Sequence, residues 1–372
     1  MNIFPDYHNN IINVSASLSA YLGMDTPYPR LKLLSAALNK KAYKNVVLIV
    51  FDALGYHVLK RHLDRADFLL QNVRSRITSV FPSTTTNATA TLMSLSYPGE
   101  HCWLGWSLYF SEIAAPVDVF IKKMSGRDEP APAGLIESAI PYECFYNHAN
   151  SAYISVYTVF PEIVDRGHSK NHILYDGLEE MFTCISALCQ APERKLVFAY
   201  APEPDTTMHR YGVGSVTAAK IIREINDRTA DFASKAGDDT LLVITADHGQ
   251  IDITRHIELY QDQKLMGFLS RPLSLEGRAT SFAIKPGQAE EFREYFHSAY
   301  PDCALYRADE LIASGVFGPT MKDKGRDFLG DFIAVPADGA AFLLHGQAAP
   351  YLGNHGGLLP GEMEVPLIIW SK

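Results

Sequence analysis

The sequence has no long apolar run, few cysteines and a shortage of positive charge. No apolar stretch approaches the roughly 20 residues that a membrane-spanning helix needs. The first residues lack a basic segment followed by a continuous apolar run, so no secretory signal is expected. The five cysteines form no C-x-x-C pair, which favours buried thiols over a disulfide framework. These absences predict a cytoplasmic protein that does not associate with a membrane.

The net charge of −9 makes a nucleic acid polymer an unfavourable partner. A small anionic substrate remains compatible with this charge, because a bound metal ion can supply local positive charge. Hydrophobic residues make up 47% and charged residues 20% of the 372 residues, as in soluble globular proteins. This length fits one large α/β domain with an insertion, or two domains. Composition does not determine the oligomeric state.

Short, continuous apolar runs recur along the chain, and patterns with helical periodicity separate them. The runs that indicate buried strands are 45–51, 151–157, 195–200, 240–245 and 365–370. The main helical patterns are 86–95, 174–190 and 215–235. Strands that alternate with helices predict an α/β fold with a large, mostly parallel sheet sandwiched between helices.

Two stretches interrupt this alternation. Residues 107–145 contain four prolines and predict an irregular segment on the surface. Residues 265–345 combine strand-like segments with an acidic helical pattern at 288–300, which predicts a small α+β insertion subdomain. The predicted main domain therefore consists of residues 1–264 and 346–372.

Residue types that bind metal ions follow one predicted strand after another. They are Asp52, Asp205, His209, Asp247, His248 and His355. Each one alone has a plainer interpretation, because aspartates often stabilise turns and helix starts. Together they are a stronger signal, since ligands of an open α/β sheet bind beyond the carboxyl ends of its strands. Three Asp and three His suit two Zn²⁺ ions about 4 Å apart, a spacing that clamps a phosphoryl group.

The hydroxyl-rich segment "FPSTTTNATAT" at 81–91 marks the predicted junction of a strand and a helix. Helix N-termini favour anions, because their first N–H groups are unpaired and the helix dipole is positive there. One hydroxyl from Ser83 to Thr86 would suffice as a helix cap. The run supplies several, so the competing interpretation is that one threonine is a metal-activated nucleophile.

Four motifs resemble those of the nucleotide pyrophosphatase/phosphodiesterase family in the alkaline phosphatase superfamily. "EPDTTMHRYG" at 203–212 resembles the family segment EPD-x-x-G-H-x-x-G, with Met208 in place of the usual glycine. "ADHG" at 246–249 and "NHGG" at 354–357 resemble its DHG and final HG segments. "TLMSLSYPGEHCWLG" at 91–105 resembles the stretch that follows the nucleophile. The resemblance implies an alkaline phosphatase-like fold and places the nucleophile at Thr85, with Thr84 and Thr86 as alternatives.

The resemblance also implies a binuclear metal centre. One ion would be bound by Asp52, Thr85, Asp247 and His248, and the other by Asp205, His209 and His355. The ions would be Zn²⁺, with Mn²⁺ as the alternative. The asparagine that stabilises the phosphoryl group in nucleotide-cleaving members is replaced by Trp106 when the positions are counted forward. The candidate substrate contacts are therefore Asn87, the indole of Trp106 and the backbone N–H of Thr86.

The predicted function is two-metal-dependent hydrolysis of phosphoric esters through a phosphothreonine intermediate. The main interpretation is a phosphodiesterase or nucleotide pyrophosphatase, with a small phosphorylated substrate such as a nucleotide. The alternatives are a phosphonoacetate hydrolase, a phosphomonoesterase, a Mn²⁺-dependent phosphomutase, and a metal-binding interaction module without turnover. No Arg or Lys occurs between Phe81 and Phe110, which favours a diester over the more highly charged monoester.

Overall fold

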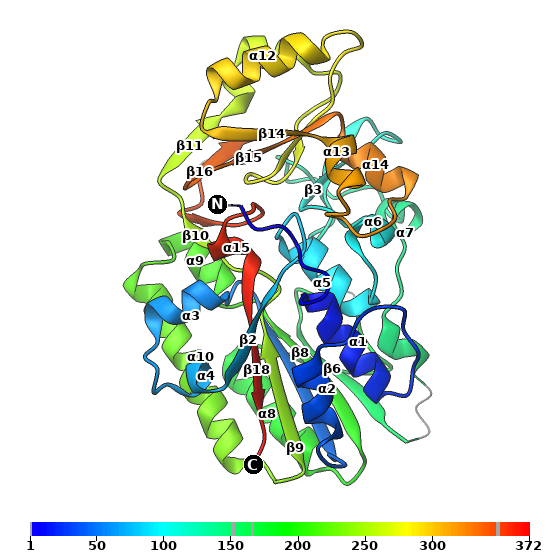
Figure 1. Cartoon of the computed structure of the whole chain (residues 1–372), viewed down its shortest axis with the longest axis vertical. Coiled ribbons are helices and arrows are strands. Elements are labelled where there is room, and N and C mark those ends of the chain that lie inside the picture. The colour runs from blue at the N-terminus through cyan, green and yellow to red at the C-terminus, as the bar shows by residue number, and fades with distance from the viewer. Residues whose placement is uncertain (1, 150–152, 165–166, 347–349) are drawn as a thin grey trace.

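The computed structural model describes residues 2–149, 153–164, 167–346 and 350–372. These residues are organised around two seven-stranded sheets. Figure 1 shows the larger sheet in the lower part of the molecule and the second sheet above it. The loops at the upper edge of the larger sheet lie between the two sheets.

The larger sheet is mostly parallel. Its strands lie in the order β2 (Val73–Thr78), β18 (Glu364–Trp370), β9 (Thr240–Thr245), β1 (Asn45–Phe51), β8 (Lys195–Ala201), β6 (Ser155–Pro161) and β7 (Asn171–Tyr175). All the pairs from β9 to β7 are parallel, whereas β18 runs antiparallel to both β9 and β2. The prediction of an α/β fold with a large, mostly parallel sheet is confirmed.

The apolar runs located the central strands well, because these strands are buried on both faces. β1 and β9 span the predicted residues, and β8 and β18 each extend one residue further. β6 begins at Ser155, later than predicted, and residues 151 and 152 of that run lie outside the described residues. β2 and β7 were not predicted. They form the two edges of the sheet and are largely exposed, so they lack a continuous apolar run.

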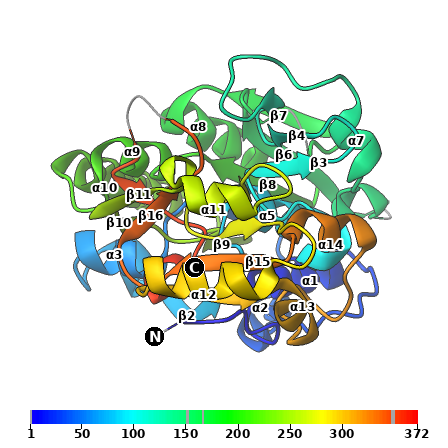
Figure 2. The ribbon, with the colours of Figure 1, turned by 90° about the horizontal axis from the view of Figure 1, so that it is seen from above.

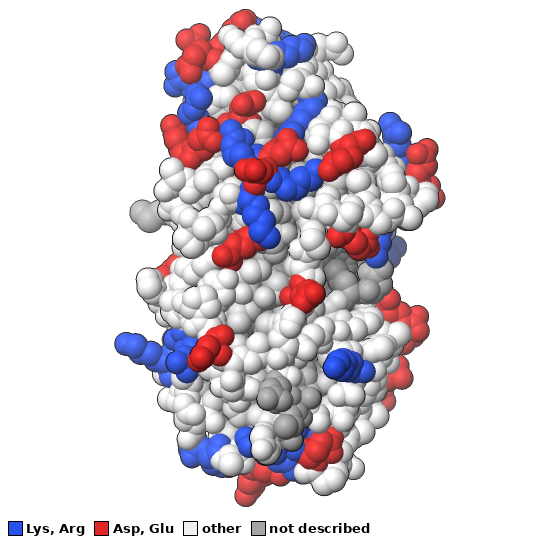
Figure 3. Space-filling model, turned by 90° about the vertical axis from the view of Figure 1, so that its right-hand side faces the viewer, with Lys and Arg blue, Asp and Glu red and all other residues white. Residues whose placement is uncertain are grey.

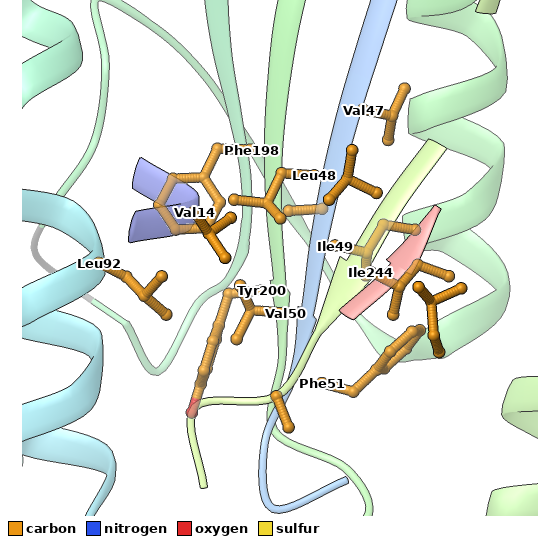
Figure 4. Packing of buried hydrophobic residues seen from close by; sticks show 14 of the residues in the cluster. Val14, Val47, Leu48, Ile49, Val50, Phe51, Leu92, Phe198, Tyr200 and Ile244 are labelled. Carbon is orange, nitrogen blue, oxygen red and sulfur yellow. The ribbon is translucent and has the colours of Figure 1, made fainter. Parts of the chain in front are cut away.

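Helices cover both faces of the larger sheet. α1 (Ile11–Tyr21), α2 (Lys32–Asn39) and α5 (Thr85–Ser94) lie on one side, and α8 (Gly177–Gln190) and α10 (Val216–Lys235) lie on the other (Figures 2 and 4). Among the described residues, no helix is long and apolar enough to cross a bilayer.

The remaining helices are short. They are α3 (Tyr56–His62), α4 (Phe68–Gln71), α6 (Pro98–His101), α7 (Leu135–Ala139), α9 (Asp205–Tyr211), α11 (Gln263–Phe268), α12 (Ala289–Ala299), α13 (Ala308–Ala313), α14 (Asp323–Leu329), α15 (Pro360–Met363), and the 3₁₀ turns Phe145–His148 and Leu259–Gln261.

Side chains alternate between the two faces of β1, so each face packs against its own helices. Leu48 and Val50 point toward Val14 of α1 and Leu92 of α5, whereas Ile49 points to the opposite face (Figure 4). All five side chains are at most 1% exposed. Full burial of such a side chain contributes roughly 1.5–3 kcal/mol. The strand is therefore held rigidly, and so is the loop that follows it.

The second sheet is antiparallel along its hydrogen-bonded pairs. Its order is β14 (Cys303–Arg307), β15 (Phe332–Pro336), β13 (Thr280–Phe282), β12 (Ser274–Leu275), β3 (Ser107–Phe110), β4 (Ala115–Asp118) and β5 (Lys123–Met124). Two small sheets pair β10 (Ile251–Asp252) with β17 (Gly353–Asn354), and β11 (Arg255–Glu258) with β16 (Ala340–Leu343).

Residues 107–124 are more regular than the sequence indicated. β3, β4 and β5 come from this segment, and β3 joins the second sheet by pairing with Leu275 of β12. Pro116 lies within β4 and lacks an N–H group, while its carbonyl oxygen accepts a hydrogen bond from the backbone N–H of Ser125 (3.0 Å). The prediction of an irregular segment is therefore wrong for these residues. The domain boundaries, with residues 265–345 as an insertion subdomain, stay a prediction.

Candidate active site

The carboxyl ends of three adjacent strands deliver the predicted aspartates. Asp52 directly follows β1, Asp247 lies two residues after β9, and Asp205 begins α9 a short loop after β8. Since β8, β1 and β9 are neighbours in the sheet, these loops meet at one edge. His355 reaches the same place from the loop that follows β17. All four side chains are buried.

His248 and two aspartates form one group of potential ligands. The Nε2 atom of His248 lies 3.4 Å from Asp52 Oδ1 and 3.4 Å from Asp247 Oδ2. The other oxygen of Asp247 accepts hydrogen bonds from two backbone N–H groups. Glycine is required at position 249, because a Cβ on Gly249 would lie 2.1 Å from the carbonyl oxygen of Gly361. This close packing fixes the loop that carries the group.

Asp205 is the centre of a second group. Its Oδ2 lies 3.3 Å from the Nε2 of His209, one helical turn later in α9, as the spacing of four residues predicted. Its Oδ1 lies 3.6 Å from the Nε2 of His355. The ring of His355 stacks on that of His248 with centroids 3.9 Å apart, which joins the two groups. The structure thus brings together all six ligand candidates, and their role in metal binding stays a prediction.

All three imidazoles are oriented through their Nδ1 atoms. Each Nδ1 is within hydrogen-bond distance of a backbone carbonyl oxygen: His209 with Gly353 (2.8 Å), His248 with Gly249 (3.0 Å) and His355 with Ser83 (3.0 Å). A carbonyl can only accept, so Nδ1 carries the proton in the neutral ring and Nε2 keeps its lone pair. Each Nε2 faces the aspartates. This is the tautomer in which a histidine binds a metal ion.

The electrostatics of the site fit a bound cation. Burial, together with the charge of neighbouring carboxylates, raises the pKa of Asp52 and of Asp247. Burial also lowers the pKa of His355 well below its usual value. Burial alone would raise the pKa of Asp205, but three nearby histidines bring it to about 2. Within the described residues, no Lys or Arg is among the main influences on these groups.

Two carboxylate oxygens of the site need a partner. Asp205 Oδ1 and Asp247 Oδ2 are buried and have no hydrogen-bond partner in the part of the chain that the structure describes. A buried, charged oxygen is costly unless it is paired or bound to a metal. Imidazole nitrogens and carboxylate oxygens are the donors that suit Zn²⁺ and Mn²⁺. The residues present therefore fit divalent metal ions.

Thr85 lies at the first position of α5 and faces the first group of ligands. Its Oγ1 is 3.1 Å from His248 Nε2 and 3.4 Å from both carboxylate oxygens of Asp52. The side chain is 4% exposed. Of the three consecutive threonines, Thr85 is thus the one with hydrogen-bond contacts to the candidate ligands. Its role as nucleophile stays a prediction.

The N-terminus of α5 is left open to an anion. Thr84 occupies the N-cap position, yet its side chain accepts no hydrogen bond from the first turn of α5, all of which the structure describes. By contrast, the N-cap side chains of α1 and α10, Asn10 and Ser215, do accept such bonds. The first N–H groups of a helix have no acceptor inside the helix. In α5 they remain available to a phosphoryl group next to Thr85.

Two of the three predicted substrate contacts, the side chains of Asn87 and Trp106, have other partners. The amide nitrogen of Asn87 donates to the carbonyl oxygen of Pro82 (2.9 Å), and so it braces the turn before α5. The ring of Trp106 stacks on Phe120 with centroids 5.6 Å apart. Their role as oxyanion donors stays a prediction. By contrast, the N–H groups of the first turn of α5 can donate to a phosphoryl group without breaking a hydrogen bond inside the helix.

The sequence interpretation missed Tyr200, whose hydroxyl donates a short hydrogen bond to Asp52 Oδ2. Burial raises the pKa of Tyr200 well above its usual value, so the phenol remains a donor. The register of the strands explains the contact, because Tyr200 pairs with Val50 across β8 and β1, and Asp52 lies two residues beyond Val50. A spacing of two residues places side chains on the same face of a strand. Glu276, between β12 and β13, was also missed; its pKa is raised to about 7 by burial.

Replacing Tyr200 by phenylalanine is expected to weaken metal binding at the Asp52 group about 10- to 100-fold, the usual effect of losing a partner that orients a ligand. The ring remains to fill its space in the core. Competition with a chromogenic chelator measures the affinity. Tyr175→Phe is the matched control, because Tyr175 is also buried but donates to the backbone oxygen of Tyr200 (2.7 Å). The role of Tyr200 would be contradicted if the Tyr200→Phe variant bound the metal ion as tightly as the Tyr175→Phe variant.

The sheet is mostly parallel, with Asp and His residues at its carboxyl edge and a threonine at the start of a helix. This fold is that of an alkaline phosphatase-like α/β protein. The family is more specific. The model of the type I phosphodiesterase/nucleotide pyrophosphatase family matches residues 46–358, which is most of the chain. The chain belongs to this family.

The chain is similar to several known proteins at low sequence identity. Human ectonucleotide pyrophosphatase/phosphodiesterase family member 7 is 28% identical over 125 residues, which cover 31% of this chain and 27% of that protein. The structure of murine ectonucleotide pyrophosphatase/phosphodiesterase 5 is similar with a TM-score of 0.64 and 18% identity over 87% of each chain. Phosphonoacetate hydrolase from Sinorhizobium meliloti has a TM-score of 0.61 and 16% identity, over 88% of this chain and 90% of that chain. These structures show a shared fold.

Proposed function

We propose that the protein hydrolyses phosphoric esters with two divalent metal ions, as a phosphodiesterase or nucleotide pyrophosphatase, through a phosphothreonine at Thr85. The observation that carries this proposal is the position of Thr85. Its hydroxyl lies between a buried Asp/His cluster and the open N-terminus of α5. A hydroxyl nucleophile needs both a group that favours its deprotonation and a site that holds the phosphoryl oxygens.

The chain's own residues account for binding and orientation. The residues that would hold the ions are Asp52, Asp247 and His248 with Thr85, and Asp205, His209 and His355. Bound Zn²⁺ or Mn²⁺ would supply Lewis-acid stabilisation of the phosphoryl group. The N–H groups of the first turn of α5 would donate to the phosphoryl oxygens, while Thr85 Oγ1 attacks phosphorus in line with the leaving group. The bond from phosphorus to the leaving-group oxygen breaks as the bond to Thr85 Oγ1 forms. Water then cleaves the phosphothreonine, which releases the phosphorylated product and regenerates the Thr85 hydroxyl.

The proposed substrate is a small phosphorylated molecule, with a nucleotide as the first candidate. An inactive variant of murine ectonucleotide pyrophosphatase/phosphodiesterase 5 was solved in complex with AMP, which supports this choice. The face in Figure 3 carries intermixed Lys, Arg, Asp and Glu without an extended basic region, which does not favour a nucleic acid polymer on that face. A cytoplasmic location stays a proposal; no disulfide joins any of the five cysteines in the described residues.

A diester is expected to be the better substrate. Bis(p-nitrophenyl) phosphate or a nucleotide p-nitrophenyl ester should have a kcat/KM at least about tenfold higher than p-nitrophenyl phosphate, a difference of ~1.4 kcal/mol in activation free energy. A monoester dianion brings one more negative charge. The segment that holds Thr85 supplies no Arg or Lys, and the carboxyl group of Glu276 adds to the negative charge that acts on His209.

The measurement uses the same metal ion and pH for every substrate. Phosphonoacetate belongs in the panel, since the phosphonoacetate hydrolase resembles this chain in fold. A higher kcat/KM for p-nitrophenyl phosphate would overturn the diesterase proposal and favour a phosphomonoesterase. Turnover of phosphonoacetate alone would favour the phosphonate reaction.

A further inference from the structure

A buried ion pair joins the second sheet to the end of the larger sheet. Arg278, between β12 and β13, donates from Nε to Glu362 Oε1 (2.9 Å) and from Nη2 to Glu362 Oε2 (2.8 Å). Glu362 lies in α15, just before β18. Both side chains are 0% exposed. The Nη1 of Arg278 donates to the backbone oxygens of Asp338 and Ala340, so all three guanidinium nitrogens are used.

The carboxylate of Glu362 also holds the loop that carries His355. Its Oε1 accepts a hydrogen bond from the N–H of Gly357 (2.8 Å), and its Oε2 accepts one from the N–H of Leu359 (3.1 Å). A Cβ at position 357 would lie 2.8 Å from both carboxylate oxygens of Glu362, so a larger residue than glycine would displace this carboxylate. The backbone on the C-terminal side of His355 is therefore fixed by one buried side chain.

The same loop is bonded to the segment that carries Thr85. The hydroxyl of Ser83 donates to the carbonyl oxygen of Gly357 (2.8 Å), and the carbonyl oxygen of Ser83 faces the Nδ1 of His355 (3.0 Å). Ser83 lies two residues before Thr85. A continuous series of hydrogen bonds thus runs from Arg278 through Glu362, Gly357 and Ser83 to the imidazole of His355.

Stability alone is a weak explanation for this pair. Removing two charges from water is unfavourable, and buried ion pairs can often be replaced by apolar residues of similar volume without loss of stability. What apolar residues cannot provide is the fixed, two-pronged geometry of a guanidinium and a carboxylate, or acceptors for the N–H groups of the loop.

We infer that Arg278 and Glu362 are positioning residues, which set the orientation of His355 as a metal ligand and the place of Thr85 relative to it. This inference rests on the proposed function. It also assigns a role to the second sheet, which supplies Arg278 to a metal centre that is otherwise built at the edge of the larger sheet.

The test uses the double variant Arg278→Met/Glu362→Leu, which removes both charges together. The double variant should fold with a lowered melting temperature, because the N–H groups of Gly357 and Leu359 lose their acceptors. Titration with Co²⁺ should show an affinity at least about tenfold lower for one of the two ions. The visible absorption of the Co²⁺ protein should also change, because it reports the geometry of the ligands. With a diester substrate, kcat should fall more than KM rises.

Glu362→Gln provides a second measurement if the double variant does not fold. It keeps the shape of the side chain but removes its charge and one acceptor, and a similar loss of Co²⁺ affinity is expected. The matched control is Arg271→Met. Arg271 forms an ion pair with Asp327 (3.0 Å) beside the second sheet. Within the described residues, its hydrogen bonds go to Asp327 and Phe328 and to no residue of the loop that carries His355. This control should keep wild-type Co²⁺ binding.

A folded variant with wild-type Co²⁺ affinity, spectrum and kcat would show that the pair is merely structural and would overturn the inference. If the wild type binds Co²⁺ but cleaves no ester, the proposed function fails, and the Co²⁺ data alone decide the inference. If the wild type binds no Co²⁺, both fail.

Discussion

Replacing Thr85 by alanine is expected to lower kcat by about 10⁴-fold or more, the effect seen when an enzyme loses its nucleophile. The hydroxyl is the group that lies between His248 and Asp52, and no neighbouring threonine has contacts with these ligands among the hydrogen bonds of the described residues. The metal ligands other than Thr85 remain. The variant should therefore still bind phosphate or vanadate in the presence of metal ions, which calorimetry can measure.

Thr84 and Thr86 provide the controls. Thr84→Ala should keep measurable activity and cost less than the ~1 kcal/mol of an ordinary helix cap, because the Thr84 side chain makes no capping hydrogen bond within α5. Thr86→Val should also remain active, since the Thr86 hydroxyl is buried and has no hydrogen-bond partner among the described residues. If Thr85→Ala stays active and one of these two does not, the nucleophile is the neighbour.

The purified protein is expected to bind about two divalent metal ions per chain, and their removal by a chelator should abolish turnover. The physical reason is the cluster of buried carboxylates and imidazoles, with two carboxylate oxygens that have no hydrogen-bond partner in the described residues. Elemental analysis gives the number of ions and their identity, and adding back Zn²⁺, Mn²⁺ or Mg²⁺ shows which ion restores activity.

Single ligand variants distinguish the two groups. Asp205→Asn and His209→Ala should each reduce the metal content by about one ion and lower activity, because both residues lie in the second group. Their circular dichroism should stay that of the wild type, since loop and helix-end ligands add little to the core. No bound metal in the wild type, and no activity restored by any of the three ions, would overturn the two-metal proposal.

Local patterns in the sequence determined the central strands and the positions of the aspartates. The runs that became β1, β8 and β9 are continuous and apolar because each strand is buried on both faces, and this leaves a signal within six or seven residues. The chemistry at their ends followed, because an open sheet binds ligands beyond the carboxyl ends of its strands. Edge strands and short loops leave no such signal.

The tertiary structure decided which side chains meet and how they are held. The sequence could not show that Thr84 leaves the start of α5 uncapped, that Tyr200 orients Asp52, or that residues 107–124 join the second sheet. Nor could it show that Arg278 holds the loop of His355 through Glu362. The contacts of Tyr200 with Asp52, of Arg278 with Glu362 and of β3 with β12 join residues that are far apart in the sequence, so no local period or spacing encodes them. They exist only after the two sheets have packed and the polar groups buried between them have found partners.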